Sequence, residues 1–178
     1  MTSLTYNTYN RIKSDLKENF KYKNDLEIPK LKFISINTGI KAVDSDNKTN
    51  SYILSELSKI AGQKAVYTYS TKAISGFKLR QGMVIGCKVT LRGKKMYQFL
   101  DRLINISLPR IRDFRGLSSK GFNGSAHYSF GIKDHSIFLE VDLDNIVKIF
   151  GMNINIISTA KSKEETIYLL KKLNLPLK

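Results

Sequence analysis

The chain has 178 residues, a length typical of one compact domain, and 42% of them are hydrophobic, which is enough for a real core and excludes a disordered basic tail. Its formal net charge of +15 would destabilise a compact fold through self-repulsion unless a polyanion binds it. A single cysteine excludes a disulfide framework and a Cys-based zinc site, and there is no long apolar run or signal-peptide pattern.

Periodicity predicts four elements in the first part of the chain. An amphipathic helix is expected over residues 6–21 and a strand over residues 31–38. A second helix should follow the polar stretch 44–50, with Gly62 in the place of a capping glycine at its carboxyl end. A short strand over residues 65–69 comes next.

The stretch that follows is the most informative part of the chain. A loop over residues 71–82 leads into a long strand over residues 83–92, so a hairpin is expected there. Between residues 57 and 100 there is no Asp or Glu, but there are nine Lys or Arg. The strand alternates, which predicts a buried apolar face and a solvent-facing polar face, made respectively of Ile85, Cys87, Val89 and Leu91 and of Gly86, Lys88, Thr90 and Arg92.

The remaining elements complete an α-β-α-β-β-α-β-α-β-α order. A helix over residues 96–106, closed by Pro109, is followed by an irregular stretch 110–124 and a strand 126–132. An extended stretch 136–141 then leads to a short helix capped by Asp142 or Asp144. The chain ends with a strand 152–156 and a last helix that has a Ser162/Glu165 capping box. This order predicts an α+β fold in which a largely antiparallel sheet has helices packed on one face and carries a long basic hairpin loop. With only three Pro and no linker, residues 1–178 are expected to form a single domain.

Two basic segments are candidate polyanion sites. In the loop, Lys72, Lys78 and Arg80 surround Phe77; a solvated hairpin tip is the simpler interpretation, but long loops with cations and an aromatic are usually functional. In the second segment, Arg110, Arg112 and Arg115 suit bidentate phosphate contacts, although Asp113 could pair with one of them.

Other constellations point less clearly to chemistry. His127 and His135 could form an acid–base pair, but on strand and loop they are more simply incidental. The acidic group at Glu140, Asp142 and Asp144 lacks the glycine turn of a calcium loop, which leaves helix capping or a basic protein partner as its role. Residues 121–124 match the G-x-x-G clamp of KH domains, but a strand rather than a helix should follow.

Long ordered motifs show that the chain resembles the bacterial-type large-subunit ribosomal protein number five family along nearly its whole length. They lie at residues 36–39, 58–64, 73–82, 85–93, 108–118, 128–132 and 159–162. The resemblance implies a structural protein of the ribosomal central protuberance that binds 5S rRNA, reaches peptidyl-site tRNA with its long loop and helps to bridge to the small subunit. Leu139 stands where the family often has proline, and residues 40–50 match poorly.

The resemblance also implies roles for particular residues. The expected rRNA contacts are Asn37, Gln63 and Thr90, with Lys64, Lys88 and Arg92 beside them. The loop 72–81 should face the tRNA elbow through Lys72, Gly76, Phe77, Lys78, Arg80 and Gln81. Residues 136–144, with Glu140, Asp142 and Asp144, should face a basic small-subunit protein. Independently of the resemblance, the suitability of arginine for phosphate makes Arg110, Arg112 and Arg115 expected additional RNA or bridge contacts.

No enzymatic activity, cofactor, metal or membrane contact is expected. The alternatives are a small RNA-processing enzyme that uses His127 or His135, and an RNA-binding adaptor outside the ribosome. Heavy use of Lys and Ile and the absence of Trp are typical of an AT-rich coding genome. The family match begins near residue 6 and leaves no room for a transit peptide, so the prediction is a mitochondrion-encoded protein, with a plastid or bacterial one as the alternative.

Overall fold

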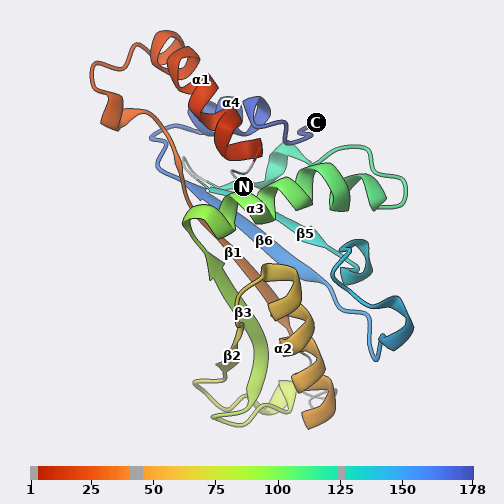
Figure 1. Ribbon diagram of the computed structural model, residues 1–178. Coiled ribbons are helices and arrows are strands. Elements are labelled where there is room, and N and C mark those ends of the chain that lie inside the picture. Colours follow the sequence, from red (N-terminus) through yellow and green to blue (C-terminus); the bar gives the residue numbers. More distant parts are fainter. Residues whose placement is uncertain (1–3, 41–45, 124–126) are drawn as a thin grey trace. The chain divides into compact units, whose positions relative to one another are not determined.

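The computed structural model describes residues 4–40, 46–123 and 127–178 (Figure 1). The poorly matching stretch 40–50 and the G-x-x-G stretch 121–124 therefore lie partly outside the described residues. The α-helices are α1 (Leu4–Phe20), α2 (Asn47–Ala61), α3 (Gly93–Arg102) and α4 (Lys163–Lys172). The strands are β1 (Leu31–Gly39), β2 (Val66–Tyr69), β3 (Val84–Leu91), β4 (Phe122–Asn123), β5 (His127–Ile132) and β6 (Met152–Ser158).

The chain forms two compact units. The terminal unit comprises residues 1–34, 91–130 and 155–178 and contains α1, α3 and α4, and the hairpin unit comprises residues 35–90 and 131–154 and contains α2 and β2. Each of β1, β3, β5 and β6 begins in one unit and ends in the other. The expectation of a single domain stays a prediction. No helix in the described ranges is long and apolar enough to cross a membrane.

The strands form one sheet in the order β2-β3-β1-β6-β5-β4. The pairs β2–β3 and β4–β5 are antiparallel. Two further contacts join the end of β1 to the start of a neighbouring strand, as antiparallel pairing requires. Ile40 N donates to Ile85 O of β3 at 2.8 Å, and Thr38 Oγ1 donates to Gly151 O, just before β6, at 2.7 Å. The α+β class with a largely antiparallel sheet is confirmed.

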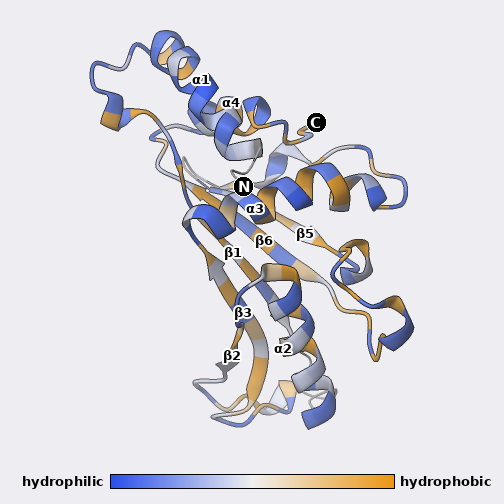
Figure 2. Cartoon of the chain, in the orientation of Figure 1, coloured by the Kyte–Doolittle hydropathy of each residue, from blue (hydrophilic) through white to orange (hydrophobic). Residues whose placement is uncertain are grey.

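The strands alternate between buried and open positions as their sequences predict. In β6, Met152, Ile154 and Ile156 are buried, and in β3 so are Cys87, Val89 and Leu91. Hydrophobic and hydrophilic bands alternate along β6 in Figure 2.

Gly86 departs from the expected pattern. Alternation places it on the solvent-facing side of β3, but it is buried, and a Cβ there would lie 2.3 Å from the backbone oxygen of Thr38. The strand backbones approach so closely at this point that only glycine fits.

The helix ends match the sequence signals at three places. Gly62 caps α2 in the left-handed region, with φ of 64°. At α4, Ser162 Oγ accepts from Glu165 N at 3.2 Å, while Glu165 Oε2 accepts from Lys161 N at 2.8 Å. The expected stop at Pro109 is confirmed within one residue: α3 ends at Arg102, but the helical run continues as a π-turn and then a 3-10 turn that contains Pro109 and ends at Arg110.

The expected extended conformation of residues 136–141 is also wrong. A 3-10 turn covers His135–Ile137, and Asp134 Oδ1 accepts from Ser136 N at 2.8 Å. Asp142 caps a second 3-10 turn, Leu143–Asn145, by accepting from Asp144 N, which confirms its capping role. Asp side chains that bond to nearby backbone N–H groups favour turns over strand pairing, and this outweighs the apolar pattern here.

Candidate nucleic-acid interface

The solvent-facing side chains of β3 are flanked by β1 on one side and by β2 on the other. Since Ile40 N bonds to Ile85 O, antiparallel pairing places Asn37 of β1 opposite Lys88. On the other side, Val66 of β2 pairs with Lys88. Lys88 and Val66 are exposed and Asn37 is partly exposed. This row presents one cation, one amide and one apolar side chain to solvent.

The next position along β3 is occupied by Thr90, which is partly exposed. Gln63, just after the Gly62 cap, donates from Nε2 to Thr90 O at 3.2 Å. The amide is therefore fixed beside the strand, and in the described part of the chain its Oε1 accepts no hydrogen bond. Lys64 follows and is exposed. The structure thus brings Asn37, Gln63, Thr90, Lys64 and Lys88 together in the hairpin unit; we call this group the strand face.

Arg92 belongs to the terminal unit. Its guanidinium lies over the ring of Phe33 at 5.3 Å from the centroid. A stacked guanidinium keeps its N–H edge free for an anion, so Arg92 is suited to a phosphate contact while it is held in place.

The basic loop is a locally folded hairpin tip at the end of β2 and β3 (Figure 1). Its base is closed by Ser70 N donating to Met83 O at 2.8 Å, and Ile74 and Leu79 exchange two backbone hydrogen bonds of 3.0 and 3.1 Å. All side chains from residue 71 to 78 are exposed, including Phe77 at 69%. The loop therefore has internal order but presents Lys72, Gly76, Phe77, Lys78, Arg80 and Gln81 to solvent.

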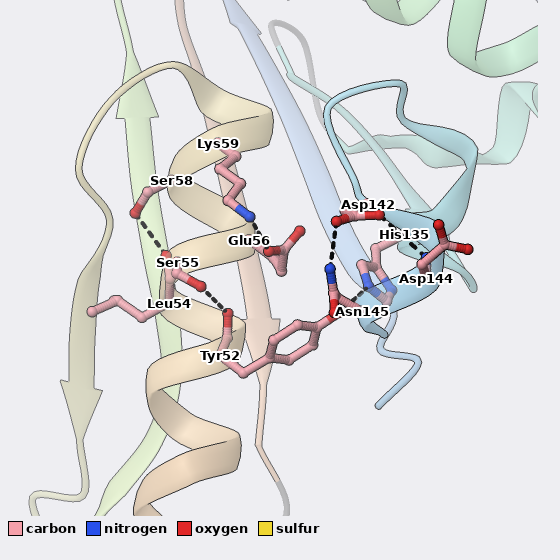
Figure 3. A network of polar contacts seen from close by, with 10 residues as sticks. All are labelled: Tyr52, Leu54, Ser55, Glu56, Ser58, Lys59, His135, Asp142, Asp144 and Asn145. Atoms are coloured by element: carbon pink, nitrogen blue, oxygen red, sulfur yellow. Dashed lines mark hydrogen bonds and ion pairs between the residues drawn. The ribbon is translucent and has the colours of Figure 1, made fainter. Parts of the chain in front are cut away.

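The acidic stretch lies in the hairpin unit and is attached to α2 (Figure 3). His135 is fully buried; its ring stacks on Phe150 with centroids 4.0 Å apart, and its Nε2 lies 3.3 Å from the hydroxyl of Tyr52. Asp142 and Asp144 are exposed, and Glu140 is partly exposed. Four large apolar side chains in the same stretch are also exposed, namely Leu139, Leu143, Val147 and Ile149.

The burial of His135 argues against a catalytic acid–base pair of histidines. His127 is exposed, whereas His135 is fully buried and offers no ring nitrogen to a substrate. Burial lowers the pKa of His135, against the opposing effect of Asp134, and its Nδ1 accepts from Phe150 N at 3.4 Å. Its two ring nitrogens are engaged in holding the fold. Among the described residues no group of three or more His, Cys, Asp or Glu side chains could hold a metal ion.

Sequence reasoning missed several exposed positions. Val66 and Asn153 extend the solvent-facing surfaces of β2 and β6, and the alternation of these strands could have identified them. The exposed apolar side chains between residues 139 and 149 could not have been found from periodicity, because this stretch has turns instead of a regular element.

Comparisons with known proteins identify the family. Residues 24–80 match ribosomal protein L5, and residues 84–177 match the C-terminus of the same ribosomal family. The large ribosomal subunit protein uL5 of Geotalea daltonii is 52% identical over 92% of this chain and 91% of its own length. The uL5 proteins of Geobacter sulfurreducens (49% identical, covering 96% and 95%) and Syntrophomonas wolfei (47% identical, covering 97% and 98%) match similarly.

These relatives are bacterial ribosomal proteins and they cover almost all of the chain. The two family matches lie on either side of residues 81–83, so they include both the strand face and the acidic stretch. The chain therefore belongs to the ribosomal protein L5 family and is a structural, non-enzymatic constituent of the large ribosomal subunit.

Proposed function

We propose that the strand face binds the backbone of 5S rRNA within the large subunit. The observation that carries this proposal is the row in which Asn37, Lys88 and Thr90 lie on solvent-facing positions of adjacent strands, with the amide of Gln63 fixed beside them. Lys88 supplies charge for a phosphate, while amides and hydroxyls suit phosphate or ribose oxygens. Arg92, which lies over the ring of Phe33, is proposed as a separate rRNA contact within the terminal unit.

The basic loop is proposed to contact peptidyl-site tRNA. The support is its exposure: three cations and Phe77 project from a tip with no acidic side chain. Cations of this kind follow a nucleic-acid backbone without reading its sequence, and a ribosome requires that tolerance because every tRNA passes through it. The loop as a whole is expected to move about its base without tRNA and to be held in one position when tRNA is bound.

The acidic stretch is proposed to contact a basic small-subunit protein. Its carboxylates would repel RNA phosphates, and Leu139, Leu143, Val147 and Ile149 add the exposed apolar area that a protein partner can bury. We propose that the ribosome concerned is of bacterial type, in keeping with the bacterial relatives; they give no support to a mitochondrial location.

Binding of a 5S rRNA transcript at several salt concentrations tests the strand face. Replacing Lys88 with Ala should reduce the slope of log K against log salt by about 0.7–0.9, the release expected for one phosphate contact. Lys88→Arg is the matched control, because it keeps the charge and should keep the slope. A Lys88→Ala protein that is folded and shows the parent slope would rule out a phosphate contact at this position.

A further inference from the structure

A second cationic surface lies in the terminal unit, on the segment that we call the arginine loop, residues 108–117. Arg110, Arg112 and Arg115 are exposed, and in the described parts of the chain none of them forms an ion pair. Asp113, also exposed, does not pair with them either. The sequence left open whether Asp113 neutralises an arginine, and the geometry favours three free guanidinium groups.

Three acidic side chains elsewhere in the terminal unit pair with lysines. Asp15 pairs with Lys172 at 3.2 Å and Asp25 with Lys17 at 2.6 Å. Glu27 similarly pairs with Lys161. Most of the +15 net charge lies in this unit, and among the described residues the arginine loop has three arginines without an ion pair and one aspartate in six residues. An external anion could therefore bind to these arginines.

The conformation of the arginine loop is fixed at its first end. Leu108 is fully buried and begins a 3-10 turn, and Ile111 N donates back to Leu108 O at 3.1 Å. Ile111 and Phe114 are only partly exposed, while the three arginines are exposed. The apolar side chains thus anchor the segment and leave the arginines in solvent.

The last residues of the chain hold the other end. Leu117 N donates to Pro176 O, and Lys178 N donates to Leu117 O, both at 2.8 Å. Gly116 lies between, with φ of 95° and its Cβ position 3.3 Å from Pro176 O, so a larger residue would be strained there. We call residues 176–178 the strap.

We propose that the arginine loop is a second RNA-backbone contact, separate from the strand face, and that the strap sets its shape before binding. Guanidinium groups match phosphate oxygens with two parallel hydrogen bonds. A loop already held at both ends loses less conformational freedom when it binds. Ribosomal RNA is the polyanion that surrounds a constituent of the large subunit. The inference rests on the proposed function only in that both sites bind ribosomal RNA.

Salt-dependent binding to protein-free large-subunit rRNA, with a 5S rRNA transcript present, tests the arginine loop. Replacing all three arginines with Gln should reduce the salt slope by about 0.7–0.9 for each phosphate that the variant no longer binds. This reduction should add to that of Lys88→Ala, because separate sites contribute independently. An unchanged slope in a folded triple variant would overturn the inference and would leave an acidic protein as the partner.

Two substitutions at one position test the strap. Lys178→Pro removes the N–H that donates to Leu117 O, while Lys178→Ala keeps that N–H and, like the proline variant, lacks the charged side chain. We expect the proline variant to bind the rRNA several-fold more weakly than the alanine variant. Equal binding by the two variants would show that the strap does not shape the site.

Cleavage of RNA from a tethered iron chelate distinguishes the two sites. Cys87 is buried and its pKa is raised to about 11 by burial, so a chelate should attach only to an introduced cysteine. Chelates at Arg112→Cys and at Lys88→Cys should cut different RNA segments. No cleavage from position 112, or the same segments from both, would refute the arginine-loop site; no 5S rRNA cleavage from position 88 alone would refute the strand-face proposal instead.

Discussion

Individual side chains hold the candidate surfaces in place, and His135 is the clearest case. It is buried between Tyr52 of α2 and Phe150, next to the acidic stretch. The charged groups near it are Asp134 and Glu56, both of which favour the protonated ring, but the loss of hydration on burial outweighs them and lowers its pKa. The neutral ring is therefore part of the folded state.

This lowered pKa predicts a loss of stability in mild acid. Below about pH 6.5, the ordinary histidine value, the unfolded chain takes up a proton that the folded chain resists. The free energy of unfolding should therefore decrease as the pH falls from about 6.5 toward the lowered pKa of the folded protein. Urea unfolding of the parent and of His135→Gln over a pH series measures this. If the two proteins show the same dependence on pH, another group is responsible.

Gly86 makes a second prediction at the residue scale. A Cβ at this position would lie 2.3 Å from Thr38 O and 3.2 Å from Thr68 Oγ1, so Gly86→Ala must push β1 and β3 apart. We expect a loss of about 1–3 kcal/mol or more in the free energy of unfolding. Gly39→Ala is the control, because nothing lies within 4 Å of its Cβ position. Equal stability of the two variants would contradict the close approach.

The secondary-structure elements differ in how far the sequence predicts them. Alternation in the sequence predicts the strand after the basic loop, because no polar residue interrupts the buried side formed by Cys87, Val89 and Leu91. The turns of residues 135–145 do not, because local bonds from Asp134 and Asp142 decide them. The sequence predicts the strand-face residues. It does not predict the hydrogen bond from Gln63 to Thr90 O, because periodicity does not show that the end of α2 lies next to β3.

Deletion of residues 75–80 tests the basic loop as an element. The bonds that close its base, Ser70 N to Met83 O and Gly82 N to Ser70 O, lie outside the deletion, so folding and 5S rRNA binding should persist. Retention of peptidyl-site tRNA on reconstituted ribosomes should weaken. Replacing Lys72, Lys78 and Arg80 with Gln is the control that keeps the loop length. Unaltered tRNA retention, or loss of 5S rRNA binding, would show that the loop serves another ligand.

On the scale of the whole molecule, charge is distributed unevenly. The hairpin unit carries the acidic stretch with its exposed apolar side chains, whereas most of the positive charge lies in the terminal unit. A protein that binds RNA on some surfaces needs a different chemistry where it meets another protein. The acidic stretch supplies that difference.

Charge reversal in the acidic stretch tests this division. Glu140→Lys and Asp144→Lys, combined with Asp142→Asn to keep the turn cap, should weaken subunit joining and leave incorporation into the large subunit intact. Light scattering of mixed subunits and sedimentation of large subunits measure the two effects. Glu18→Lys on α1 is the control, since its carboxylate is exposed in the terminal unit. Failure to incorporate would indicate that the acidic residues stabilise the fold.

The burial of Cys87 has a practical consequence for studies of the assembling particle. The thiol is 1% exposed and lies next to Lys88 in β3, so a modifying reagent can reach it only when the strand opens. The rate at which the thiol is labelled therefore reports how often this strand opens locally. Comparing that rate in the free protein and in the ribosome would give the protection that RNA confers on this strand, without any change to the sequence.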